Sequence, residues 1–256
     1  MTAYLGPPGN SPGSPLLCFH HAGGGASLYQ NWERALTPLA SVMPVLLPGR
    51  ERRAREPRFV SIDALVADLD TQLGPYLSMP GGHIFFGHSM GALVAYRLAR
   101  HRHAAGKALP RALLLSAFSA PHLPSPFAAV DSLDDNQLAQ MMEGVGGLAV
   151  DLPEQWRADL LAVARDDLRV CDSYVDAGDP PLPCPIHVFG GDDDPLVTPD
   201  DLRAWDEHST EPVSVHILRG DHFYLRDAPE PLLAELRSIL RRYVERRPAR
   251  WESTVW

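Results

Sequence analysis

The sequence predicts an α/β fold in which a mostly parallel central sheet carries helices on both faces. Short, continuously apolar segments alternate along the chain with amphipathic helical patterns, as is typical of parallel strands that are buried on both sides. Residues 120–185 break this alternation with helical patterns alone. A chain of 256 residues can build one large domain, so we expect a single domain over residues 1–256.

The order of the predicted elements follows from these patterns. Apolar segments predict strands at residues 16–19, 42–47, 84–86, 113–115, 186–189 and 213–218. Helical patterns cover about residues 29–39, 62–76, 92–103 and 227–245, and a further helix is expected to start at Thr198-Pro199. Residues 1–14, rich in glycine and proline, and residues 247–256 are expected to be flexible tails.

The composition is that of a soluble globular protein, with 45% apolar and 21% charged residues. A net charge of −9 gives no overall attraction to nucleic acid or to an anionic membrane. No apolar run approaches the ~20 residues that span a bilayer, and residues 1–14 lack a signal-peptide pattern. We therefore expect a cytoplasmic protein without nucleic-acid or membrane partners. Cys18, Cys171 and Cys184 are expected to be free thiols rather than disulfides or a metal site.

The helical residues 120–185 lie between two predicted strands and are bounded by proline-rich hinges. An insertion of this size predicts a lid over the carboxyl ends of the strands. The alternative is a further helical layer of the core with no gating role. The second helical pattern of the insertion has one apolar face, formed by Trp156, Leu160, Val163, Ala164, Leu168, Cys171 and Tyr174.

A Gly-x-Ser-x-Gly pattern, Gly87-His88-Ser89-Met90-Gly91, stands between an apolar segment and a helical pattern. In this context it predicts a nucleophile elbow, a tight strand-to-helix turn that lifts the Ser89 hydroxyl out of the sheet edge. The alternative is a glycine-flanked serine in a surface turn, because chance gives the pattern in about one chain in ten of this length. His88 is expected to pack within the elbow.

Two later loops offer partners for Ser89, each directly after a predicted strand. The first holds Asp192-Asp193-Asp194 and the second holds His222. A serine hydroxyl needs a base to take its proton, and the base needs an orienting acid. We therefore predict a catalytic triad of Ser89, Asp194 and His222, and choose Asp194 because the proline and apolar residues that follow it fix the loop. Asp192 and Asp193 are the alternatives, and a solvated turn or a divalent-ion site is the other interpretation of the three carboxylates.

The tetrahedral intermediate of acyl transfer needs N–H donors for its oxyanion. Met90, directly after the predicted nucleophile, supplies one backbone N–H. Ala22 is the predicted second donor, because it lies in a glycine-rich loop, residues 21–25, that follows the first strand. The alternative is a plain flexible turn. The motifs found in the sequence predict neither a metal site nor a cofactor-binding site.

Five motifs together resemble type II thioesterases, the free-standing editing enzymes of polyketide and nonribosomal peptide assembly lines. They are Phe19-His20-His21-Ala22-Gly23-Gly24, Leu47-Pro48-Gly49-Arg50-Glu51, Gly87-His88-Ser89-Met90-Gly91, Asp194-Pro195-Leu196-Val197 and Gly220-Asp221-His222-Phe223, within residues 15–242. Two departures leave the triad intact and bear on lid shape and acyl preference. His20 stands where the family usually has proline, and residues 161–167 lack the proline of the family's Pro-x-x-Arg-x-Asp stretch.

The resemblance implies an α/β-hydrolase fold with a helical lid. It also implies hydrolysis of acyl thioesters from the phosphopantetheine arm of acyl or peptidyl carrier proteins, removing aberrant acyl groups without a cofactor of the enzyme's own. A dense basic loop with Arg50, Arg52, Arg53, Arg55 and Arg58 is expected to meet an acidic carrier protein, the alternative being a solvated loop with no partner. We expect a monomer.

Two other functions fit the same residues. A carboxylester hydrolase or lipase would use the same triad on an oxoester, and activity on a matched carrier-bound thioester separates the two. A non-catalytic binding module on the hydrolase fold would leave Ser89 unlabelled by a serine-reactive phosphonate.

Overall fold

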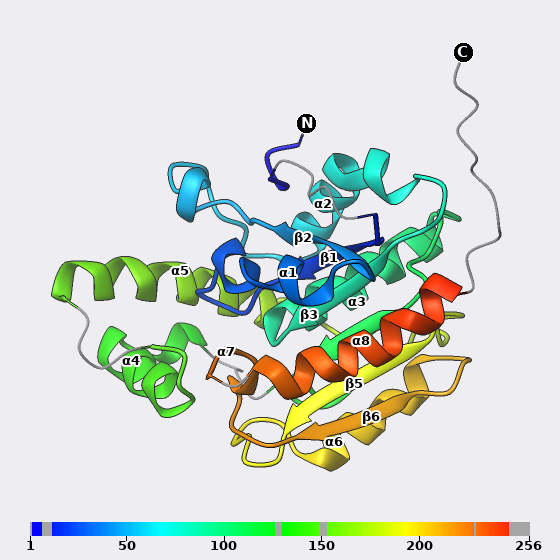
Figure 1. The fold of residues 1–256 in the computed structure, drawn as a ribbon. Helices are drawn as coiled ribbons and strands as arrows, with labels where there is room; N and C mark the ends of the chain where they lie inside the picture. Colours follow the sequence, from blue (N-terminus) through cyan, green and yellow to red (C-terminus); the bar gives the residue numbers. More distant parts are fainter. Residues whose placement is uncertain (1, 7–11, 126–129, 149–152, 228, 246–256) are drawn as a thin grey trace.

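The computed structural model describes residues 2–6, 12–125, 130–148, 153–227 and 229–245. Its centre is a six-stranded sheet of order β2-β1-β3-β4-β5-β6, in which every neighbouring pair is parallel (Figure 1). The predicted parallel sheet and its six strands are confirmed. The strands are β1 (Ser14–Phe19), β2 (Ala40–Val45), β3 (Ile84–His88), β4 (Leu113–Ser116), β5 (Ile186–Gly191) and β6 (Ser214–Leu218).

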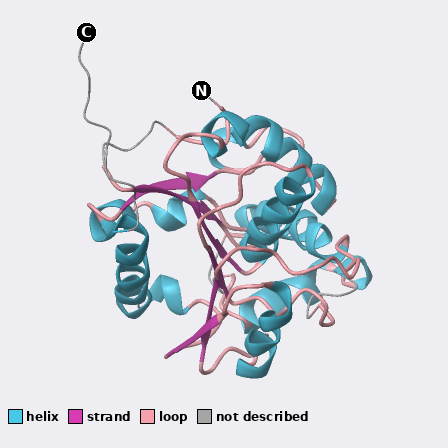
Figure 2. Cartoon of the chain, turned by 90° about the vertical axis from the view of Figure 1, so that its right-hand side faces the viewer, coloured by secondary structure: helices cyan, strands magenta, loops and turns pink. Residues whose placement is uncertain are grey.

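Helices cover both faces of this sheet, as Figure 2 shows from the side. One core lies beneath α2 (Ile62–Leu77), α3 (Met90–Ala104) and α6 (Pro199–Arg203), and the other beneath α1 (Trp32–Leu36) and α8 (Pro229–Glu245). Successive side chains of a strand point to opposite faces, so each strand supplies both cores. The side chains of β1 and β3 alternate between the cores in this way and are almost completely buried.

The first predicted helix, residues 29–39, differs from the structure. The chain forms a short 3-10 helix at Ala26–Tyr29, and α1 then ends at Leu36. Pro38 explains the early end, because the residue before a proline avoids the helical conformation. Thr37 accordingly has an extended backbone, with φ −64° and ψ 137°. At the other end of the chain, a short helix α7 (Tyr224–Asp227) precedes α8.

The N-terminal segment does not form a flexible tail throughout its predicted extent. Tyr4 and Leu5 are buried, and Leu5 forms an antiparallel bridge with Val45 at the end of β2. Their apolar side chains join the first core, which explains why the segment packs despite its glycine and proline content. The predicted tail at residues 247–256 lies outside the described residues.

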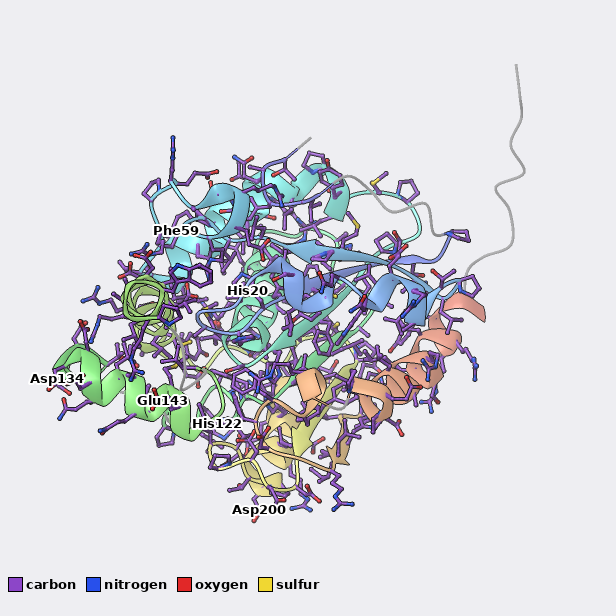
Figure 3. The ribbon with its side chains drawn as sticks, turned by 60° about the vertical axis from the view of Figure 1, so that its left-hand side comes forward. His20, Phe59, His122, Asp134, Glu143 and Asp200 are labelled. Atoms are coloured by element: carbon purple, nitrogen blue, oxygen red, sulfur yellow. The ribbon has the colours of Figure 1, made fainter. Side chains whose placement is uncertain are left out.

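The helical insertion lies between β4 and β5. It contains a 3-10 helix at Val130–Ser132, α4 (Asp135–Gly144) and α5 (Glu154–Asp172), and α5 packs against α3 as well as α4. A capping box at Asp134 starts α4, and Glu143 marks its far end (Figure 3). The described residues of the insertion are helical or irregular, apart from one β-bridge between Leu182 and Ser209.

Two expectations from composition concern thiols and membranes. Cys18, Cys171 and Cys184 are free and buried, as predicted. Burial raises the pKa of each thiol, so these side chains remain neutral and unreactive. Within the described ranges, none of the helices combines the length and apolarity that crossing a membrane requires.

Candidate active site

The turn between β3 and α3 places Ser89 in an unusual backbone conformation, with φ 54° and ψ −123°. A non-glycine residue adopts a positive φ only where the surrounding structure enforces it. Two glycines make room for the turn, because a Cβ on Gly87 would lie 2.1 Å from the Gly91 carbonyl oxygen. A Cβ on Gly91 would lie 2.1 Å from the carbonyl oxygen of Phe19 on β1. This is the geometry expected of a nucleophile elbow.

The structure brings Ser89, His222 and Asp194 into one hydrogen-bonded chain. His222 Nε2 lies 3.0 Å from Ser89 Oγ, and His222 Nδ1 lies 2.9 Å from Asp194 Oδ2. The side chains of His222 and Asp194 are only 2% and 0% exposed, and Ser89 is 3% exposed. A carboxylate at Nδ1 favours the tautomer that leaves Nε2 free to accept the serine proton.

Asp194 is distinguished from its two acidic neighbours by its contacts. Its Oδ1 accepts the backbone N–H groups of Leu196 at 2.8 Å and Val197 at 3.3 Å, so the loop after β5 holds the carboxylate still. Asp192 and Asp193 are exposed, and Asp192 Oδ1 instead accepts the N–H of Gly220. Only Asp194, of these three, contacts His222.

Neutral aromatic side chains surround His222. The rings of His88 and Phe223 lie 5.3 and 5.2 Å from the His222 ring, between centroids, and His21 packs on Phe223 at 4.8 Å. Burial lowers the pKa of His21 to about 3 and that of His88 well below its usual range, so both stay uncharged beside His222. His88 Nδ1 also hydrogen-bonds to Ser116 Oγ at 2.8 Å, consistent with the packing role expected for it.

The loop after β1, residues 20–25, lies beside the elbow and is called here the oxyanion loop. The carbonyl of His21 accepts the N–H of Gly24 at 3.0 Å and lies 2.9 Å from His20 Nδ1. Burial lowers the pKa of His20 to about 3, so this ring is neutral and its Nδ1–H donates to the carbonyl. Because N–H and C=O of a trans peptide point in opposite directions, the Ala22 N–H points away from these partners. Met90, the other predicted donor, is the first residue of α3.

Residues in or directly after the two helices of the insertion contact the loops that carry the candidate site. Asp167 on α5 accepts the N–H of Gly23 in the oxyanion loop at 2.8 Å. Gly146, just after α4, accepts a hydrogen bond at 2.7 Å from Arg226, which follows the His222 loop. The insertion therefore contacts two loops of the candidate site, and its function as a lid stays a prediction. The sequence places Asp167 at the end of a stretch that resembles the family's Arg-x-Asp pattern, but assigns it no role, because a helical aspartate gives no sign of a partner on a distant loop.

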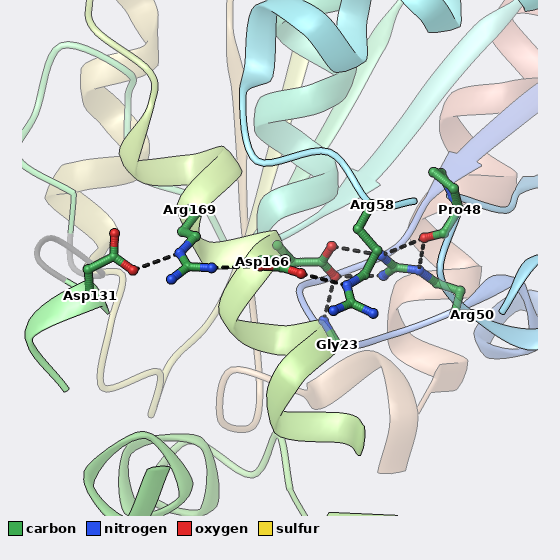
Figure 4. A network of polar contacts seen from close by, with 8 residues as sticks. Gly23, Pro48, Arg50, Arg58, Asp131, Asp166 and Arg169 are labelled. Carbon is green, nitrogen blue, oxygen red and sulfur yellow. Dashed lines mark hydrogen bonds and ion pairs between the residues drawn. The ribbon is translucent and has the colours of Figure 1, made fainter. Parts of the chain in front are cut away.

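The basic loop after β2 was expected to meet a partner protein through its arginines, and the structure corrects this expectation for two of them. Arg50 and Arg53 are 8% and 7% exposed, so neither guanidinium can meet a partner protein. Arg50 forms a two-pronged ion pair with Asp167, at 2.6 and 2.7 Å (Figure 4). Arg53 pairs with Glu56 and donates to the carbonyl of Leu46. Isolated buried charges are too costly, so each arginine is paired internally. Arg52 and Arg55 are exposed.

Comparison with known proteins gives the family of this chain. A family model described as a thioesterase domain matches residues 14–240. The match spans the sheet, the elbow, the insertion and both later loops. The chain belongs to the thioesterase family and has its α/β-hydrolase fold.

The chain is also similar to individual proteins and solved structures. The chain is 36% identical to linear gramicidin dehydrogenase LgrE of Brevibacillus parabrevis, over 90% of this chain and 88% of that protein. The structure of RedJ, a thioesterase from the prodiginine pathway of Streptomyces coelicolor, superposes with a TM-score of 0.81 and 35% identity, covering 90% and 91% of the two chains. The type II thioesterase BorB from the borrelidin cluster gives a TM-score of 0.80 and 34% identity, covering 93% and 97%.

Proposed function

We propose that this chain is a type II serine thioesterase that removes aberrant acyl groups from carrier proteins of polyketide or nonribosomal peptide assembly lines. The observation that carries the proposal is the buried Ser89–His222–Asp194 chain in a member of the thioesterase family. Support for the substrate class comes from the similarity to RedJ and BorB, thioesterases of biosynthetic pathways.

The geometry suggests the following reaction. Ser89 Oγ transfers its proton to His222 Nε2 and attacks the thioester carbonyl carbon. The N–H groups of Ala22 and Met90 hold the resulting oxyanion. The C–S bond then breaks, and His222 returns the proton to the departing pantetheine sulfur. Water, deprotonated by His222, attacks the acyl-serine, and collapse of this second intermediate releases the carboxylic acid and restores Ser89.

Replacing Ser89 by alanine tests the nucleophile. We expect Ser89→Ala to lower kcat/KM for an acyl-carrier thioester by at least about 10⁴-fold, because no other group can form the acyl-enzyme. Asp194→Asn should cause a loss of similar order, since the amide no longer favours the productive tautomer of His222. Asp193→Asn, on the same loop and exposed, is the matched control and should keep full activity.

Three outcomes would contradict the proposed function. Hydrolysis by Ser89→Ala at the parent rate would exclude the triad, and failure of a serine-reactive phosphonate to label Ser89 would favour a non-catalytic module. A higher kcat/KM on an oxoester than on the matched carrier-bound thioester would favour a carboxylester hydrolase. LgrE is named a dehydrogenase, but the Ser–His–Asp arrangement favours hydrolysis over redox chemistry for this chain.

The exposed part of the basic loop is the proposed contact for an acidic carrier protein. Charge complementarity at an interface rim changes association more than chemistry. We expect Arg52→Glu combined with Arg55→Glu to raise KM for the carrier-bound substrate roughly tenfold and to leave kcat unchanged. Hydrolysis of a short pantetheine thioester should not change. Arg241→Glu with Arg242→Glu, exposed on α8, makes the same charge change elsewhere and serves as the control.

Unchanged kinetics of the Arg52/Arg55 variant on the carrier-bound substrate would mean a solvated loop with no partner.

We further propose that the enzyme acts as a monomer without a cofactor of its own, since the pantetheine arm belongs to the partner. The proposed triad and both oxyanion donors come from one chain, which supports this. Sedimentation at working concentration tests the oligomeric state.

A further inference from the structure

The contact between Asp167 and the oxyanion loop has a specific geometry. Asp167 Oδ2 accepts the Gly23 N–H at 2.8 Å and a guanidinium N–H of Arg50 at 2.6 Å, while Oδ1 accepts a second one at 2.7 Å. The side chains of Asp167 and Arg50 are 3% and 7% exposed. A charged acceptor in such a dry site orients a backbone N–H far more firmly than water would.

This hydrogen bond fixes the peptide plane next to the predicted oxyanion donor. The Gly23 N–H belongs to the peptide between Ala22 and Gly23, which Asp167 orients from the lid side. The preceding peptide carries the Ala22 N–H, and its carbonyl is held by Gly24 and His20. Two consecutive peptides are therefore fixed, the first by the oxyanion loop itself and the second by a residue of the lid.

Packing reinforces the same contact. Ala164 lies one helical turn before Asp167, and a Cβ added to Gly23 would come within 3.3 Å of the Ala164 side chain. Gly23 also has a φ of 76°, which glycine adopts without strain. The backbone of the oxyanion loop thus lies directly on α5.

A neighbouring ion pair provides an internal comparison. Arg58 of the basic loop pairs with Asp166 at 2.6 Å, joining the loop after β2 to α5 as Arg50 and Asp167 do (Figure 4). Among the described residues, the carboxylate of Asp166 accepts hydrogen bonds only from arginine side chains, those of Arg58 and Arg169. The carboxylate of Asp167 accepts them from Arg50 and, in addition, from the backbone N–H of Gly23. If these aspartates only tethered the lid, their loss would have similar effects.

We propose that Asp167 is a positioning residue that shapes the oxyanion hole from the lid, so that the hole is complete only while α5 is seated. The inference rests on the proposed function, because it assumes that Ala22 binds the oxyanion. Asp167 acts through the backbone of Gly23 and takes no part in the chemistry itself.

The test compares Asp167→Asn and Asp167→Glu with Asp166→Asn in the full-length chain. Asp167→Glu retains the charge opposite Arg50 but displaces the acceptor from Gly23, so it covers the case in which Asp167→Asn does not fold. We expect both Asp167 variants to lower kcat on a short pantetheine thioester by about 10- to 100-fold, with KM changing less than about threefold. Affinity for a boronic acid that forms a tetrahedral adduct on Ser89 should fall by a similar factor. Asp166→Asn should change neither quantity more than about twofold.

The outcomes separate this inference from the proposed function. A wild-type protein that does not hydrolyse the thioester would overturn the proposed function. An active wild type, with Asp167 variants that lose only thermal stability or that match Asp166→Asn in kcat and boronate affinity, would overturn the inference alone.

Discussion

At the scale of single residues, the site depends on how closely the backbone of the elbow approaches the backbone at the end of β1. Ser89 reaches His222 because the elbow turns within one residue, and that turn brings Gly91 against the carbonyl oxygens of Phe19 and His20. These oxygens lie 2.1 and 2.8 Å from the position that a Cβ on Gly91 would occupy. Neither can move without displacing the end of β1 and the oxyanion loop, so a single methyl group affects the whole site.

We therefore expect Gly91→Ala to lower the free energy of unfolding by at least about 2 kcal/mol, as overpacking against backbone does, and to reduce kcat in the protein that still folds. Gly144→Ala in α4 is the matched control, since this position is exposed and a Cβ there meets nothing within 4 Å. Alanine should stabilise that helix by about 0.5–1 kcal/mol. Urea unfolding of both variants measures the difference, and equal stabilities would contradict the close approach.

Predicted site residues lie together in the structure where chemistry and chain order coincide. Ser89 and His222 follow from a motif and from loops after strands, and Asp194 from the residues that stiffen its loop. Asp167 does not follow, because its partners Gly23 and Arg50 lie 144 and 117 positions away and neither contact leaves a periodic pattern. Long-range pairing of charges depends on the folded structure.

At the scale of elements, α5 shows a limit of predicting burial from helical periodicity. Of the apolar face that its period predicts, Ala164, Leu168 and Cys171 are buried. Trp156 and Leu160 on the same face are 61% and 37% exposed. The helical period identifies which side of a helix is apolar, but not how far along the helix its neighbours extend. The contacts of α5 with the oxyanion loop are made by Ala164 and Asp167, in the C-terminal half of the helix.

The basic loop after β2 illustrates the same limit for charges. Its arginines are equivalent as a sequence pattern, yet Arg50 and Arg53 are paired within the protein while Arg52 and Arg55 face solvent. A run of like charges predicts a solvated surface, because burying any one of them requires a partner. Asp167, the partner of Arg50, lies on α5, 117 positions away, whereas Glu56, the partner of Arg53, lies only three positions further along the same loop.

At the scale of the whole molecule, buried neutral histidines link stability to pH. Burial lowers the pKa of His20 and His21 to about 3 and that of His83 and His187 to about 4, against about 6.5 in an unfolded chain. Between these values the unfolded state binds more protons than the folded state. The stability that these groups contribute is therefore present above pH 6.5 and is lost as the pH falls toward 3.

The free energy of unfolding should thus decrease from pH 6.5 to pH 4, with each such histidine adding a slope of up to about 1.4 kcal/mol per pH unit. His83→Phe, which replaces a buried ring packed on Phe85, should make that decrease shallower. His103→Gln, at an exposed position, should leave it unchanged. Chemical denaturation at several pH values measures the slopes, and identical slopes for His83→Phe and wild type would refute this account.

The position of the insertion has a consequence for how such enzymes diverge. Residues 117–185 connect β4 to β5, which are neighbours in the sheet, with Leu113 opposite Ile186. The two ends, Ser116 and Ile186, are only roughly 11 Å apart by strand geometry. A long segment joined to fixed points this close can be exchanged for another without disturbing the register of the sheet. We therefore expect that one helical insertion can replace another in this fold, provided that each new insertion supplies an acceptor for the N–H of Gly23.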